Sequence, residues 1–155
     1  MFEPADGPTH PYMTSSPGCW KAFGELIAAD FSDRERMAFH QVVVDAYAAQ
    51  HPGTDDPRQV RSVGLHLMTL CLFLEHETDP ALGAELHRRM IRRPAFHRLH
   101  RSGHGAFTVT HVPTSGPVDA ARRAAYEWAA DVWQTYADAH ATVASWLREA
   151  GFTAR

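Results

Sequence analysis

Histidine and aspartate are the residue types of this sequence that most directly suggest chemistry. The chain of 155 residues contains eleven histidines but only two cysteines. Imidazole is the commonest protein ligand for metal ions and can also act as a general acid or base near neutral pH. The first question is therefore which of the histidines the fold brings together.

His40 and His66 form the best candidate pair of metal ligands. His40 and His51 share one helical stripe but are eleven residues apart, about 16 Å along a helix axis, so a single ion cannot bind both. By contrast, His40 and His66 stand at similar distances before and after a turn centred near Thr54. That turn predicts two antiparallel helices with both imidazoles at nearly the same height, which is how helical bundles build metal sites.

The third ligand is less well defined by the sequence. His140 is the best candidate, with Glu25 and Cys19 as other choices, and the ion would be zinc or iron. No HExxH or HxxxH motif and no core Glu-x-x-His motif supports the assignment. The alternative interpretation is that His40 caps the edge of the bundle and that His66 bonds a backbone carbonyl group in the core.

Asp45 and Tyr47 are the candidate catalytic residues. Asp45 lies in a run of valine and alanine residues, where a buried carboxylate needs a partner because an unpaired buried charge is costly. It could orient a metal-ligating histidine or accept a proton as a general base, with Tyr47 donating a hydrogen bond. The alternative is a structural pair with Arg58, Arg61 or a histidine.

The elements that must position these residues are helices. Apolar residues recur at spacings of three and four over residues 18–31, 33–50, 57–76, 80–92 and 117–150, the last with a break near 136–140. A short strand is predicted at 106–111. The histidine- and arginine-rich segment 97–104 is predicted to be a solvated loop, with a mobile lid or an anion-contacting loop as the alternative. We therefore expect an all-α, single-domain helical bundle of five or six helices at residues 18–151, preceded by an extended or flexible arm at 1–17.

Composition excludes several classes of protein. Hydrophobic residues make up 45% of the chain and charged residues 21%, and the formal net charge is −3. These values are typical of a globular domain and argue against a nucleic-acid-binding surface and against binding to anionic membranes. The longest apolar run, residues 65–74, is far shorter than the roughly 20 residues of a membrane span. With no signal peptide at the start, a cytoplasmic location is predicted.

Three segments are similar to a known family. They are HQVVVDAYAAQHPG at residues 40–53, SVGLHLMTLCLFLE at 62–75 and YEWAADVWQTYADAHATVASWL at 126–147. The chain resembles an uncharacterised family of small bacterial proteins that is described only as a domain of unknown function, and residues 44–52 are the most specific part. The resemblance implies a helical fold and a shared pocket around this segment, but no activity.

Two functional hypotheses follow. The leading one is a polar, histidine-lined pocket that binds a divalent metal ion and a small organic molecule, for metal-assisted hydrolysis or a lyase- or isomerase-type proton transfer. The other is a non-enzymatic interaction or regulatory module, homodimeric through a tryptophan-rich face of the C-terminal helices that contains Trp128, Trp133 and Trp146.

Overall fold

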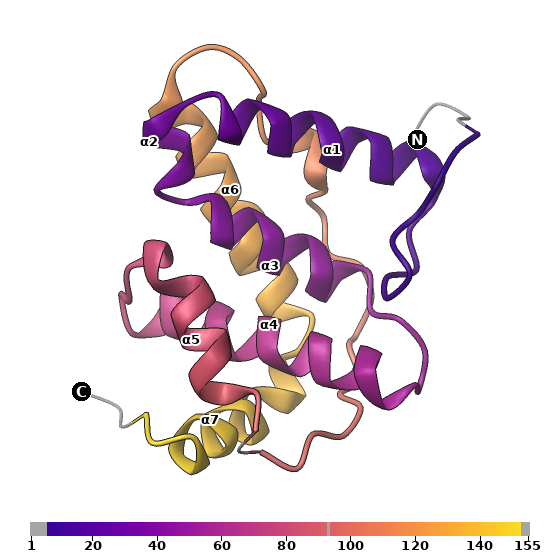
Figure 1. The fold of residues 1–155 in the computed structure, drawn as a ribbon, viewed down its shortest axis with the longest axis vertical. Coiled ribbons are helices and arrows are strands. Elements are labelled where there is room, and N and C mark those ends of the chain that lie inside the picture. The colour runs from indigo at the N-terminus through magenta and orange to yellow at the C-terminus, as the bar shows by residue number, and fades with distance from the viewer. Residues whose placement is uncertain (1–5, 93, 153–155) are drawn as a thin grey trace.

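The protein is all-helical, as expected from its sequence. The computed structural model describes residues 6–92 and 94–152, and no β-strand is present in these ranges. Figure 1 shows seven α-helices in the described part of the chain. They are α1 (Pro17–Phe31), α2 (Arg34–Met37), α3 (His40–Gln50), α4 (Pro57–Glu75), α5 (Gly83–Met90), α6 (Val118–Gln134) and α7 (His140–Glu149), with 3-10 turns at Pro80–Leu82, Val109–His111 and Ala137–Ala139.

Helix starts follow the capping chemistry of the sequence. The side chain of Ser16 accepts a hydrogen bond from the backbone of Cys19 at the start of α1. Asp56 caps α4 in the same way, and Pro57 occupies the first helical position. Such side chains satisfy backbone N–H groups that have no partner inside the helix. The sequence therefore determines where α4, the helix that carries His66, begins.

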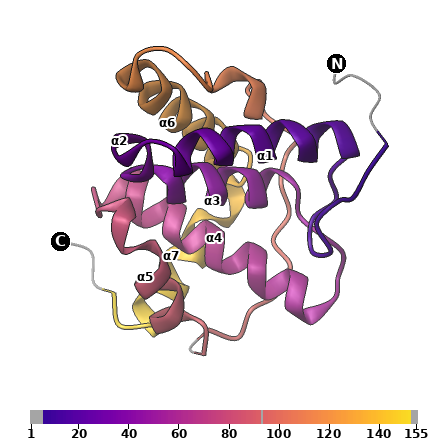
Figure 2. The same cartoon turned by 45° about the horizontal axis from the view of Figure 1, so that its top comes forward.

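Helix α3 is the centre of the fold. Eight of its eleven residues are buried, and it packs against both α4 and α6. In Figure 2, α1, α3 and α4 lie one below the other, with α6 behind them. Because most of α3 is covered, its buried polar side chains, Asp45 and Gln50, must find their partners inside the protein.

Two long predicted helices are each divided in the structure, so the described residues contain more helices than the expected five or six. The helix predicted at 33–50 is broken at Ala38 and Phe39, where Phe39 turns into the core with a non-helical backbone. The helix predicted at 117–150 divides into α6 and α7 at the break expected near 136–140.

The strand predicted at residues 106–111 is wrong. Val109–His111 forms a 3-10 turn instead. The backbone N–H groups of Ala106 and Phe107 donate to the carboxylate of Asp131 on α6, so a side chain satisfies the donors that a neighbouring strand would otherwise have taken.

The described part of the N-terminal arm, residues 6–16, has no regular helix and is fastened to the bundle. Met13 forms an isolated antiparallel bridge with Pro52, and the Thr14 hydroxyl donates to the carbonyl oxygen of Pro52. The ring of His10 lies against Tyr12 and Trp20. The prediction of an extended arm also covers residues 1–5, which lie outside the described residues.

The tryptophans of the C-terminal half lie inside the protein. Trp128, Trp133 and Trp146 are all buried within the single chain, so they do not provide the exposed face that motivated the homodimer hypothesis. Dimerisation stays a prediction, and it would need other residues. None of the helices formed by the described residues is long and apolar enough to cross a bilayer.

Candidate metal centre

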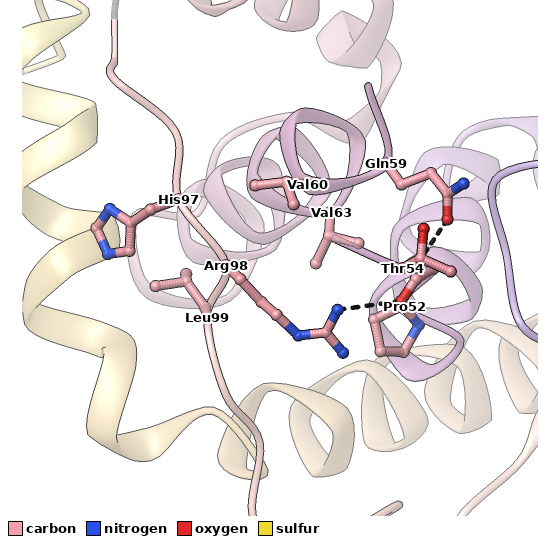
Figure 3. A pocket seen from close by; sticks show the side chains of 10 residues that line it. Pro52, Thr54, Gln59, Val60, Val63, His97, Arg98 and Leu99 are labelled. Atoms are coloured by element: carbon pink, nitrogen blue, oxygen red, sulfur yellow. Dashed lines mark hydrogen bonds between the residues drawn. The ribbon is translucent and has the colours of Figure 1, made fainter. Parts of the chain in front are cut away.

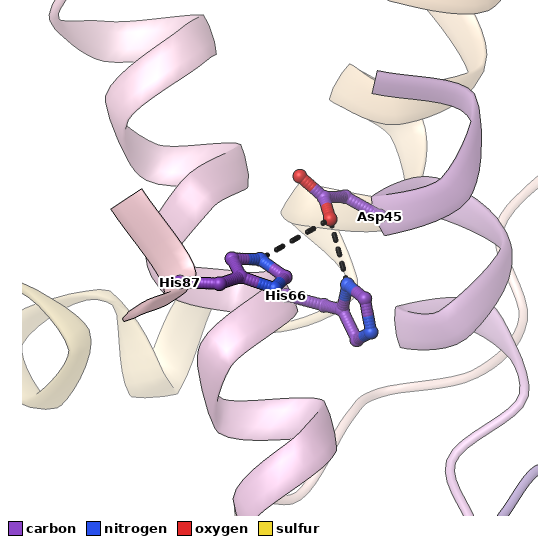
Figure 4. A group of neighbouring side chains, drawn as sticks. All are labelled: Asp45, His66 and His87. Carbon is purple, nitrogen blue, oxygen red and sulfur yellow. Dashed lines mark hydrogen bonds and ion pairs between the residues drawn. The ribbon is translucent and has the colours of Figure 1, made fainter. Parts of the chain in front are cut away.

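Asp45, His66 and His87 converge from α3, α4 and α5 (Figure 4). Oδ1 of Asp45 lies 2.6 Å from Nδ1 of His66 and 3.8 Å from Nε2 of His87. The three potential ligand atoms all lie within 4.8 Å of one another. Two imidazoles and a carboxylate form a ligand set that suits zinc or iron.

The Asp45 carboxyl group is buried among partners that carry no fixed positive charge. Its side chain is fully buried, and Oδ1 accepts a hydrogen bond from Gln41 at 2.8 Å in addition to the contact with His66. The described partners are thus an amide and two histidines, none of which carries a fixed positive charge. Oδ2 is buried and has no hydrogen-bond partner among the described residues.

His87 approaches this carboxylate because the start of α5 lies close to α3. A side chain at Gly83 would collide with Gln41, since an added Cβ would lie 2.3 Å from Cγ of Gln41. Glycine therefore allows the approach that brings His87 near Asp45. Nε2 of His87 also contacts the Thr69 hydroxyl at 3.1 Å, which fixes the ring against α4.

The lowered pKa of His87 favours metal binding. Burial lowers its pKa; the charge of Asp45 opposes this shift and the neighbouring His66 adds to it. A lowered pKa keeps the imidazole neutral at physiological pH, which is the form that binds a metal ion.

An open pocket gives access to the two histidines. It has a volume of about 240 Å³, and its lining includes His66, His87, Arg58, Arg61 and Tyr12. The side chains of His66 and His87 keep 13% and 23% of their surface exposed. The buried carboxylate thus forms the inner side of the group, and the histidines face the pocket.

His40 takes part in a different cluster. Its Nδ1 lies 3.1 Å from Oδ2 of Asp30, and Nε of Arg36 lies 3.1 Å from Oδ1 of the same carboxylate. The turn between α2 and α3 brings Arg36 and His40 to Asp30. The structure therefore does not bring His40 together with His66, and it pairs the buried charge of Asp30 with an arginine.

The other predicted site residues also lie elsewhere. Nε2 of His140 contacts the backbone oxygen of Trp133 at 2.9 Å, and the two rings stack. Tyr47 stacks on Phe23, and its buried hydroxyl has no hydrogen-bond partner among the described residues. Burial raises its pKa, so the phenol stays protonated. Neither residue belongs to the Asp45 group.

The site residues predicted from the sequence did not include His87. One signal was available: Gly83, Leu86 and Met90 are buried along α5, and His87 lies four residues after the first and three before the last, on the same side of the helix. It was overlooked because it stands among the basic residues of a helix end that was expected to be solvated.

A second group of potential ligands, Cys71, Glu75 and His76, is a weaker candidate. Burial, together with the neighbouring Glu75, raises the pKa of the Cys71 thiol to about 12, whereas a metal binds the thiolate. Glu75 accepts a hydrogen bond from the indole of Trp133 at 2.7 Å and is exposed to solvent. Its charge is therefore already stabilised.

Cys19 and His51 form a partly buried pair that is better explained as structural. Sγ of Cys19 lies 3.3 Å from Nε2 of His51, whose Nδ1 contacts the backbone oxygen of Tyr47 at 2.9 Å. Burial raises the pKa of the thiol and lowers that of the imidazole, which favours two neutral groups. The pair connects α1 to the end of α3.

The histidine- and arginine-rich loop at 97–104 is attached to the bundle in this structure. NH1 of Arg98 donates to the backbone of Gly53 and to Asp55 at 2.9 Å, and Arg101 donates to the backbone of Gln50 at 2.6 Å. Figure 3 shows the residues that line the pocket between this loop and the α3–α4 link. Its volume is about 10 Å³, room for no more than a water molecule.

The fold and this group define a small helical protein with a candidate metal centre of one aspartate and two histidines. Comparison with family models shows that the chain belongs to a family of unknown function, DUF5946, whose model matches residues 5–137. The matched range includes Asp45, His66 and His87 and confirms the resemblance to an uncharacterised family. No curated protein and no solved structure matched the chain.

Proposed function

We propose that the protein binds a divalent transition-metal ion through Asp45, His66 and His87 and uses it to act on a small organic molecule. The observation that carries the proposal is the fully buried Asp45 carboxylate, whose described partners bear no fixed positive charge and whose Oδ2 is left without a hydrogen bond.

A comparison within the same chain supports the charge argument. Asp30 is equally buried, but Arg36 contacts one of its oxygens and His40 the other. A buried ion without a counter-charge costs several kcal/mol even after relaxation. A divalent cation between Asp45 and the two imidazoles would compensate the carboxylate as Arg36 compensates Asp30.

Binding requires only a small local change. Two ligand atoms of a tetrahedral zinc ion lie about 3.3 Å apart, because each ligand bond is about 2.0–2.1 Å long. The Asp45–His66 contact of 2.6 Å would open by less than an ångström, and the His87–Asp45 contact of 3.8 Å would close. The contact between Nε2 of His87 and the Thr69 hydroxyl would be given up when Nε2 binds the ion.

Three protein ligands suit a catalytic ion better than a structural one. Structural zinc sites have four protein ligands, whereas catalytic sites keep a position for water or substrate. A metal ion at such a site supplies Lewis acidity and lowers the pKa of bound water. His66 and His87 face the open pocket, so an organic molecule can approach from solvent, and hydrolysis or a lyase- or isomerase-type proton transfer suits this arrangement.

The proposal is tested by the metal content and thermal melting of protein purified without a histidine tag. We expect near-stoichiometric zinc or iron and a melting temperature that falls on chelation, since saturating ligand stabilises the folded state. Asp45→Asn and His87→Gln should lose both effects, whereas His140→Gln should keep them. Metal-free protein whose melting does not respond to added zinc or iron would end the proposal.

A further inference from the structure

We infer that the small molecule taken by this site is an oxyanion, a compound with a carboxylate or phosphate group, and that Arg58 and Arg61 bind this group. The inference rests on the proposed metal centre for the position of the reacting end of the ligand. The assignment of the two arginines as anion ligands depends only on the residues that line the pocket.

The two arginines and the candidate metal ligands line one pocket. Arg58, Arg61 and His66 all lie on the pocket side of α4, and His87 contributes from α5. Residues three apart on a helix are neighbours, with Cβ atoms about 5–6 Å apart. Two guanidinium groups can therefore contact one anionic group from adjacent positions at the mouth of the site.

Among the described residues, no acidic side chain lines this pocket. The nearest acidic residues along the chain are engaged elsewhere: Asp55 pairs with Arg98 at 2.9 Å, and Asp56 accepts hydrogen bonds from the backbone at the start of α4. The positive charge at the pocket mouth contrasts with the overall net charge of −3 and would attract a small anion.

The guanidinium groups are also available for a ligand. Neither Arg58 nor Arg61 forms an ion pair within the described residues, whereas Arg36 is paired with Asp30 and Arg122 with Asp119. Arginine presents a planar set of donors that matches the two oxygens of a carboxylate or phosphate. Both side chains are exposed and line one pocket, so they are free to bind an anion there.

The other residues that line the pocket limit the size of the ligand. Tyr12 from the N-terminal arm and Ile91 from the end of α5 add apolar surface, and Ser62 adds a hydroxyl group. The volume of about 240 Å³ is below the roughly 300–1,000 Å³ of pockets for drug-sized ligands. A compact organic anion, with its charged group on the arginines and its reacting group toward His66 and His87, fits these dimensions.

Anion binding is tested by calorimetric titration of inorganic phosphate, and separately of acetate, into zinc-loaded and zinc-free protein. The variants are Arg58→Gln, Arg61→Gln and the double variant. Arg123→Gln is the matched control, because Arg123 is exposed on α6, outside this pocket. Circular dichroism and zinc content are measured for each variant.

We expect at least one of the two anions to bind the wild-type protein, with a decrease in affinity of about tenfold or more in the double variant, since hydrogen bonds to charged groups contribute about 1.5–3 kcal/mol. Zinc content should not change. Phosphate binding alone would indicate a phosphorylated substrate, and acetate binding alone a carboxylic acid.

The inference is overturned if neither anion binds, or if the double variant binds as tightly as Arg123→Gln. The measured zinc content shows whether the anion site or the metal centre is the proposal that has failed. A protein that binds phosphate through the arginines but takes up no zinc would refute the metal centre and keep the anion site. A protein that binds zinc but neither anion would keep the metal centre and refute the anion site.

Discussion

The carboxylate of Asp45 on α3 and the imidazole of His66 on α4 lie 2.6 Å apart in a buried contact between the two most central helices. The contact explains how a charged residue is accommodated on a helix that is covered almost all round. It leaves the negative charge without a fixed positive partner and the second carboxylate oxygen without a hydrogen bond.

The stability of metal-free protein should distinguish the two buried aspartates. Asp30→Asn leaves Arg36 as a buried unpaired cation, so it should cost about 3–5 kcal/mol. Asp45→Asn keeps the shape and removes a buried charge without a fixed counter-charge, so it should be neutral or stabilising. Urea unfolding in the presence of chelator measures both. If Asp45→Asn proves as costly as Asp30→Asn, Asp45 is paired with a protonated histidine and needs no metal.

Substitution of Gly83 should weaken the metal centre from outside the ligand set. Gly83→Ala forces Gln41 or α5 to move, because the new Cβ would lie 2.3 Å from Cγ of Gln41. Since neighbours that orient ligands typically contribute 10–100-fold to metal affinity, we expect a decrease of about tenfold in zinc affinity. Gly24→Ala is the control, because no atom lies within 4 Å of its added Cβ. Equal zinc affinity in the two variants would show that the packing of α5 does not position His87.

The sequence predicted the α3–α4 hairpin and named two of the three residues of the site. The end of α3 at His51 and Pro52 and the capped start of α4 place Asp45 and His66 on facing antiparallel helices, and a histidine was among the partners considered for Asp45. His87 was not predictable in the same way. Its spacing from Gly83 and Met90 on α5 was one signal, but which helix this side of α5 meets depends on tertiary contacts such as the approach of Gly83 to Gln41.

The position of His40 was predicted incorrectly for a related reason. The apolar spacing at residues 33–50 is continuous, so it indicates a single helix. Burial of Phe39 and the attraction of Arg36 and His40 to Asp30 break that helix, and no local pattern reveals a partner ten residues away in the sequence.

Metal-free protein should become less stable as the pH falls from 7.5 to 5.5. Burial lowers the pKa of His87 below 6.5 in the folded state, so the unfolded chain binds more protons in this range. Stability then decreases with falling pH, and the contribution is lost as pH passes from the unfolded to the folded pKa. His87→Gln should show a smaller decrease in urea unfolding experiments than His100→Gln, an exposed control. The same decrease in both variants would show that His87 does not contribute.

Both cysteines should be unreactive in the folded protein. Cys19 and Cys71 are buried, and burial raises the pKa of each thiol, so little thiolate is available to react. We expect very slow reaction with Ellman's reagent at pH 8 and complete reaction in denaturant. Fast reaction of one thiol, assigned with Cys19→Ser, would indicate that Cys19 and His51 form a reactive thiolate–imidazolium pair.

The most direct test of the metal centre is isothermal titration of zinc into chelator-treated, untagged protein at pH 7.5. We predict one saturable site per chain. Asp45→Asn and His87→Gln should lower the affinity by about 100-fold or more, since loss of a ligand costs at least as much as loss of a neighbour that orients one. Asp30→Asn, if folded, should bind zinc like the wild-type protein. Absence of saturable binding, or equal affinity in wild type, Asp45→Asn and His87→Gln, would contradict the assignment.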